Sequence, residues 1–126
     1  MSKFNGNAIT WFEIPANDIQ RAISFYETML DAKLTQFPNE DACYMFPAEP
    51  GSVAGALIQR PQSKPASDGT TVYLNVDGKL DASLKRAEKL NAKILVPRTE
   101  IPGGFGYFAC VQDSEGNNVG LHSREF

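Results

Sequence analysis

Glu13 is the residue whose type and position most suggest chemistry. It stands between Phe12 and Ile14 in a segment rich in strand-forming residues. A carboxylate among apolar neighbours is costly unless it is paired or lines a wet pocket. In a cleft, such a carboxyl group can act as a general base with a raised pKa. A structural carboxylate bonded to backbone or to an arginine explains the same pattern, so both roles stay open.

Two other side chains could complete a reaction site. His122 is the only histidine, and an imidazole changes its charge near neutral pH, so it could act as an acid or base. A partly exposed histidine near the C-terminus explains its position without any role. Tyr73 offers a phenol as a hydrogen-bond donor. We therefore take Glu13, His122 and Tyr73 as the candidate catalytic residues.

Side chains alternate between the two faces of a strand, and this decides which residues can share a site. Trp11 and Glu13 fall on one face of the first predicted strand, and Thr71 and Tyr73 fall together in a later one. Trp11 could form an aromatic wall for a ligand. It could equally be an ordinary core aromatic.

The elements that position these residues begin with a strand at about residues 8–14, which Pro15 stops. Asn17 and Asp18 can cap the helix that follows, and Asp31-Ala32 ends it. Three further strands are predicted at about 33–36, 43–46 and 53–59. The buried face of the helix is predicted from its 3.6-residue periodicity and comprises Ile19, Ala22, Ile23, Tyr26 and Met29.

The chain repeats this pattern. Residues 29–34 resemble residues 89–94 at an offset of 60, and residues 51–55 resemble residues 116–120 at an offset of 65. Two matches in the same order predict a duplicated unit. The second unit has a strand at 70–76, a helix with an apolar stripe over 80–90, and strands at 93–96, 107–111 and 118–123. The turn at 113–116 is a predicted hairpin turn.

Residues 61–69 form a polar, proline-containing connector between the two units. The sequence therefore predicts a single domain over residues 1–126. A first module covers about residues 7–60 and a second module about residues 70–124.

The sequence resembles the vicinal oxygen chelate superfamily, which includes glyoxalase, bleomycin-resistance and dioxygenase-like proteins. Residues 9–15 (ITWFEIP), followed by Asp18, Arg21-Ala22 and Phe25-Tyr26, resemble the opening of these proteins. Residues 113–117 (DSEGN) resemble their final hairpin. The resemblance implies an α+β fold in which two βαβββ modules form curved mixed sheets around a cavity.

Metal-dependent members of this superfamily hold a divalent ion through His, Glu or Gln on the first and last strands of each module. The corresponding residues here are Trp11, Thr71, Gly55 and Gly120, none of which is a normal side-chain ligand. We therefore predict no metal and no other cofactor. A metal enzyme with shifted ligands, such as Glu13 with His122, would leave the ion under-coordinated.

The resemblance also implies which residues line the cavity. Alternation along the strands groups Leu57 and Gln59 with Gly55, and His122 with Gly120, all on the cavity side. Tyr44 and Tyr107 are expected at the cavity mouth. The predicted substrate-binding residues are Trp11, Thr71, Gly55, Leu57, Gln59, Gly120, Tyr44 and Tyr107.

Two functions fit these residues. The first is metal-independent chemistry on a small organic molecule, which in this superfamily would be a glyoxalase-related lyase or isomerase activity. The second is non-catalytic binding of a small molecule, as in the drug-sequestering, bleomycin-resistance-like members. The sequence leaves open whether the protein is an enzyme.

Composition excludes other classes of function. The net charge of −3 and the absence of a Lys/Arg run argue against nucleic acid as a partner. No apolar run has the length of a membrane helix. Cys43 and Cys110 are too few for a disulfide framework, and two reduced cysteines are typical of a cytoplasmic protein. The exposed sheet edges that the fold implies predict a homodimer.

Overall fold

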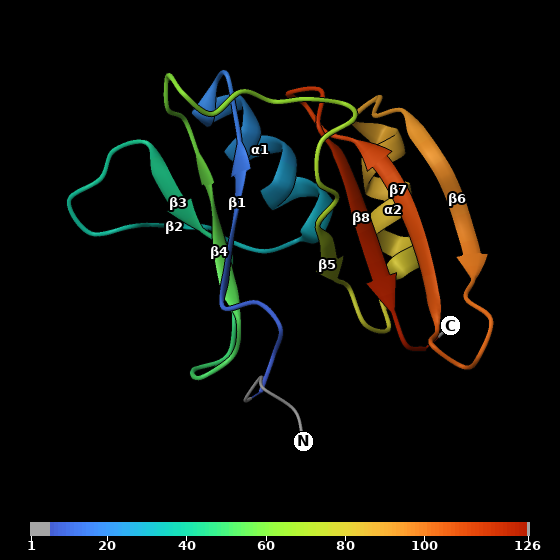
Figure 1. Cartoon of the computed structure of the whole chain (residues 1–126). Coiled ribbons are helices and arrows are strands. Elements are labelled where there is room, and N and C mark those ends of the chain that lie inside the picture. The colour runs from blue at the N-terminus through green and yellow to red at the C-terminus, as the bar shows by residue number, and fades with distance from the viewer. Residues whose placement is uncertain (1–5, 126) are drawn as a thin grey trace.

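Two four-stranded sheets, each accompanied by one helix, form the protein in a computed structural model that describes residues 6–125 (Figure 1). The α+β class and the two βαβββ modules are as predicted. The first module contains β1 (Trp11–Pro15), α1 (Ile19–Leu30), β2 (Thr35–Gln36), β3 (Cys43–Met45) and β4 (Ala54–Ile58). The second contains β5 (Tyr73–Asn75), α2 (Leu80–Lys89), β6 (Ile94–Glu100), β7 (Tyr107–Gln112) and β8 (Asn118–Ser123).

Both sheets have the same strand order. The first runs β1-β4-β3-β2 and the second runs β5-β8-β7-β6. In each, the first strand of the module is an end strand and pairs in parallel with the last. Figure 1 shows β1 and β5 facing each other between the two sheets. Each module therefore presents one unpaired strand edge to the other.

Each helix is followed within two residues by a residue with a positive φ angle, and these two residues lie 60 positions apart. Asp31 and Asn91 have φ angles of 52° and 62°, in the left-handed region that Asn and Asp tolerate better than most residues. At its start, α1 is capped by Asp18, whose side chain accepts a 3.1 Å hydrogen bond from the backbone N–H of Arg21. This confirms the predicted cap, while α2 has no side-chain cap at Lys79.

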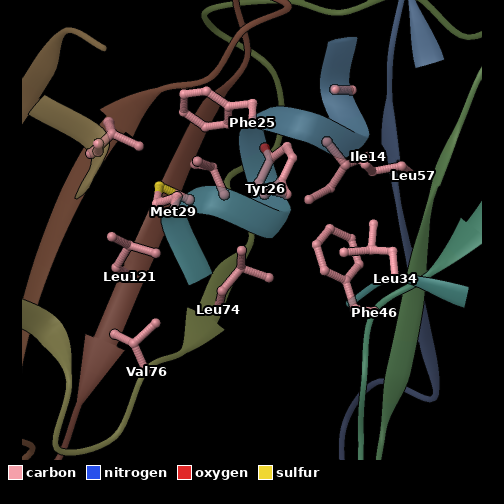
Figure 2. Close-up of a cluster of buried hydrophobic side chains, with 14 of the residues drawn as sticks. Ile14, Phe25, Tyr26, Met29, Leu34, Phe46, Leu57, Leu74, Val76 and Leu121 are labelled. Atoms are coloured by element: carbon pink, nitrogen blue, oxygen red, sulfur yellow. The ribbon is translucent and has the colours of Figure 1, made fainter. Parts of the chain in front are cut away.

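One apolar core joins the two modules. Tyr26 and Met29 of α1 are fully buried. Figure 2 shows them between residues of the two sheets, with Leu57 on the side of the first and Leu121 on the side of the second. We call the face of each sheet that packs against this core the helix face, and the opposite face the outer face.

The sequence offset between the last strands of the two modules, β4 and β8, is one residue smaller than predicted. The N–H of Ala16 bonds to the carbonyl of Ile58 at 2.8 Å, and the N–H of Val76 bonds to that of His122 at 2.9 Å. Residue 76 lies 60 positions after residue 16, but residue 122 lies 64 positions after residue 58, not 65. Gly120 therefore corresponds to Ala56 and not to Gly55. A shift of one residue moves a side chain to the other face of the sheet.

The hairpin turn at residues 113–117 holds the two modules together. The Glu115 side chain is completely buried. It accepts hydrogen bonds from the backbone N–H groups of Asn17 and Asp18 at 2.9 and 2.8 Å and from the Arg21 guanidinium at 2.7 and 3.0 Å. Burial alone would raise the pKa of Glu115, but these bonds lower it to about 2.

Two neighbouring residues extend this network. We call it the intermodule clasp, and it is formed by Asp113, Glu115 and Asn117 with Arg21 and Tyr26. Tyr26 donates a 2.5 Å hydrogen bond to Asp113, and burial, followed by the charge of Asp113, raises the pKa of its phenol. The Asn117 amide donates to the carbonyl of Pro15 at 2.8 Å. The predicted turn is thus also a polar contact between modules.

Neither helix in the described part of the chain is long and apolar enough to span a membrane.

Candidate functional site

A groove of about 1260 Å³ separates the two modules. Its walls come from β1 and β5, and residues 7–9, residues 51–54 and part of the connector complete it. The Asn117 amide of the clasp also reaches the lining and accepts a 3.1 Å hydrogen bond from the N–H of Ala66 in the connector.

Trp11 and Glu13 stand on one wall of the groove. As predicted, they share the outer face while Ile14 enters the core. The Trp11 indole N–H donates a 3.3 Å hydrogen bond to one oxygen of Glu13. The other oxygen accepts a 3.0 Å bond from Arg60, and the two side chains of that ion pair are about one-third exposed. Glu13 is therefore an ion-paired carboxylate.

Tyr73 stands on the opposite wall and is 53% exposed. Its ring lies directly over Gly120, so that a Cβ atom at residue 120 would come within 2.2 Å of the ring. The ring also packs edge-on against Phe108, with centroids 6.1 Å apart. Partial burial, followed by the interaction with the Cys110 thiol, raises the pKa of the phenol. Tyr73 thus fills the space that Gly120 leaves.

The structure brings together four of the predicted site residues. Trp11, Glu13, Thr71 and Tyr73 all line the groove. Each module contributes two of them, from the first strand or the residues just before it.

Three residues predicted on the cavity side lie on the helix face instead. Leu57 is fully buried in the core, and a Cβ atom at Gly55 would meet the Phe12 ring at 2.4 Å. Gln59 accepts a 2.8 Å bond from the backbone N–H of Ile19 and so helps to cap α1. The expectation was wrong because it aligned Gly55 with Gly120, one residue out of register.

Four others also lie away from the groove lining. Tyr44 and Tyr107 pack against the core, so the expectation that they lie at the cavity mouth is wrong. Gly120 is covered by Tyr73. His122 lies on the outer face of the second sheet, where its Nε2 is 2.7 Å from the carbonyl oxygen of Phe105. Neither His122 nor Tyr73 has a hydrogen bond to Glu13 in the structure.

The sequence reading missed Arg60, which holds Glu13. Ala56 and Ile58 lie on the outer face of β4, and the next residue in this alternation is Arg60. The correct register would therefore have identified Arg60 as a neighbour of Glu13. Lys64 and Lys79 also line the groove, and only the folded chain places them beside it.

Comparison with known proteins identifies the family of the chain. The model of the Glyoxalase/Bleomycin resistance protein/Dioxygenase superfamily matches residues 8–121. The chain belongs to this superfamily. The predicted resemblance is confirmed over nearly the whole chain. No curated protein matches the sequence significantly.

Solved structures of the superfamily share the fold. A glyoxalase/bleomycin resistance protein from Albidiferax ferrireducens superposes with a TM-score of 0.75 at 16% identity, covering 93% of this chain and 99% of the other. The fosfomycin resistance protein FosX from Listeria monocytogenes gives 0.67 at 12% identity, covering 94% and 91%. A lactoylglutathione lyase from Agrobacterium tumefaciens gives 0.62 at 20% identity, covering 92% of each chain.

The residues at the superfamily's metal positions do not fit a divalent ion. By the resemblance and the observed register, the positions that hold the superfamily's metal ligands carry Trp11 in β1, Thr71 just before β5, Ala56 in β4 and Gly120 in β8. None of these side chains is a normal metal ligand. Among residues 6–125, no group of three or more His, Cys, Asp or Glu side chains is close enough to hold an ion.

Proposed function

We propose that the protein binds an uncharged, aromatic organic molecule in the groove between its modules, without a metal and without catalysis by Glu13. Exposed aromatic side chains on opposite walls, Trp11 and Tyr73, supply stacking surfaces. Ile9, which is 55% exposed, adds apolar area on the Trp11 side.

The hydrogen bonds of Glu13 are the observation that favours binding over catalysis. A general base needs an oxygen within hydrogen-bond reach of the proton that it removes. Both oxygens of Glu13 are already bonded, one to Trp11 and one to Arg60. In this arrangement Glu13 orients the indole ring and neutralises the guanidinium. The metal-independent enzyme is the alternative function of the same site. It would use a remaining lone pair of Glu13, because each carboxylate oxygen can accept a second hydrogen bond.

The charges of the groove support an uncharged ligand. Among residues 6–125, the charged side chains that line the groove are two carboxylates, Glu13 and Asp31, and two ammonium groups, Lys64 and Lys79. These four formal charges sum to zero. Arg60, which pairs with Glu13 from outside the lining, brings the net formal charge of the site to only +1, so the site does not strongly favour a charged ligand.

Crystals soaked separately with indole, quinoline and naphthalene test the proposal. We expect electron density for at least one compound in the groove, in contact with Trp11 or Tyr73. The Trp11→Ala and Tyr73→Ala variants should lose that density. Density confined to other surfaces, or unchanged in both variants, would contradict the proposal.

We also propose that the protein is a homodimer. Besides β1 and β5, which face the groove, each sheet ends in a second edge strand, β2 or β6, and such edges favour association. Closed two-fold assemblies are the commonest way to cover them.

A further inference from the structure

The groove is bounded by two strand edges as well as by side chains. In a parallel pair, the bonded groups of one strand alternate, so every second residue directs its N–H and C=O toward the partner strand. The N–H of Ala16 bonds to β4, so the residues of the same parity, Phe12 and Ile14, also face β4. The main-chain groups of Trp11 and Glu13 therefore point away from it.

The same reasoning applies to β5. The carbonyl of Val72 and the N–H of Val76 both bond to β8, so Leu74 faces β8 as well. Tyr73 and Asn75 then direct their N–H and C=O groups to the free edge. No described residue bonds to these main-chain groups, nor to those of Trp11 and Glu13.

Pro15 provides an independent check of this direction. It has the same parity as Glu13, and its carbonyl accepts the 2.8 Å bond from Asn117 of the second module. The free edge of β1 thus faces the second module. Both edges line the same groove, and Glu13 corresponds to Tyr73 at the offset of 60 residues.

We infer that the ligand of this groove is an extended, amide-containing chain, such as a short peptide or peptide-like compound, that pairs with the main chain of Glu13, Tyr73 or both. This inference rests on the proposed function and narrows its ligand class. An extended chain that adds to a sheet edge gains affinity from main-chain bonds and specificity from alternate side chains. Trp11 and Tyr73 would contact its aromatic side chains.

The size of the groove agrees with such a ligand. At about 1260 Å³ it exceeds the roughly 300–1000 Å³ of most small-molecule pockets. The small net charge of the site is compatible with an uncharged backbone.

A pair of isosteric probes tests the inference on the unmodified protein. The first is the capped peptide acetyl-Thr-Phe-Thr-Phe-Thr-amide. The second is its depsipeptide, in which each amide N–H is replaced by an ester oxygen. Both carry the same side chains. They differ in the main-chain donors, and the ester carbonyls are also weaker main-chain acceptors. We expect calorimetric titration to show about tenfold weaker binding of the depsipeptide, because it loses main-chain hydrogen bonds.

Proline variants test the same bonds from the protein side. A proline is tolerated where the N–H of an edge strand faces outward. Glu13→Pro and Tyr73→Pro each remove one free N–H, and Glu13→Ala and Tyr73→Ala are the matched controls for the lost side chains. We expect at least one proline variant to bind the peptide about tenfold more weakly than its alanine control. Circular dichroism verifies that each variant folds. If a proline variant does not fold, the comparison of the peptide with the depsipeptide on the unmodified protein decides.

The outcomes separate this inference from the proposed function. Equal affinity for both probes overturns main-chain pairing but leaves aromatic binding intact. Binding of indole or quinoline without binding of the peptide also overturns main-chain pairing and leaves aromatic binding intact. If neither the peptide nor any aromatic compound binds the groove, the inference and the proposed function both fail.

Discussion

At the scale of single residues, Gly120 and Tyr73 form a coupled pair. The Tyr73 ring occupies the space of a side chain at residue 120. Gly120→Ala should therefore displace the ring and destabilise the protein by about 1–3 kcal/mol, as overpacking commonly does. Gly69→Ala is the matched control, because its Cβ atom would meet nothing closer than 3.8 Å. Thermal unfolding of the two variants gives the comparison, and equal melting temperatures would refute the coupling.

Glu115 predicts how stability depends on pH. Its pKa is about 2 in the folded protein against an ordinary value of 4.5. Because the folded-state pKa is depressed, its contribution is fully present above about pH 4.5 and is lost as the pH falls toward 2. The difference corresponds to about 3 kcal/mol.

Glu115→Gln should remove most of this contribution at neutral pH and flatten the stability profile between about pH 4.5 and 2. Glu49→Gln, in an exposed loop, is the control. Urea unfolding across that pH range measures both. A profile for Glu115→Gln that keeps the slope of the unmodified protein would show that the clasp does not depend on this charge.

At the scale of elements, the cap of α1 fixes where the helix begins. Asp18 accepts from the backbone N–H of Arg21, so Asp18→Ala should lower the free energy of unfolding by about 1 kcal/mol. Asp68→Ala, an exposed carboxylate in the connector, should leave it almost unchanged. Equal losses in chemical denaturation would argue against the cap.

Local patterns predicted the elements well. The apolar spacing of α1, its cap at Asp18 and its end at Asp31 all follow from neighbouring residues. The structure confirms the cap, the end and most of the buried face, although Phe25 is also buried and Ile19 and Ile23 are only half-buried. Alternation along β1 correctly placed Trp11 and Glu13 on one face. These features depend on contacts within a few residues, which the sequence displays directly.

Contacts between distant residues were not predictable in this way. Gly55 and Gly120 stand in similar local sequences, and only the pairing of β4 with β1 shows that they lie on different faces. Residues 113–117 read as a simple turn because the bonds of Glu115 go to residues more than 90 positions earlier. The same holds for Arg60, which pairs with Glu13 across 47 positions.

At the scale of the whole molecule, two modules share one core and one polar clasp, and a groove lies between their strand edges. The proposed homodimer should appear in sedimentation velocity at micromolar protein as a species of twice the monomer mass. A single monomeric species across that concentration range would contradict it. Ligand binding is tested separately, because one chain already supplies both walls of the groove.

Trp11 gives the most direct test of the central claim, that the groove binds an aromatic ligand. It is the only tryptophan in the chain, so intrinsic fluorescence reports on one wall of the site. We expect indole-free probes, such as quinoline and the capped Phe-containing peptide, to change this emission saturably, and Tyr73→Ala to weaken the response to at least one of them. A linear, unsaturable change equal to that of free N-acetyltryptophanamide for every probe would contradict the account.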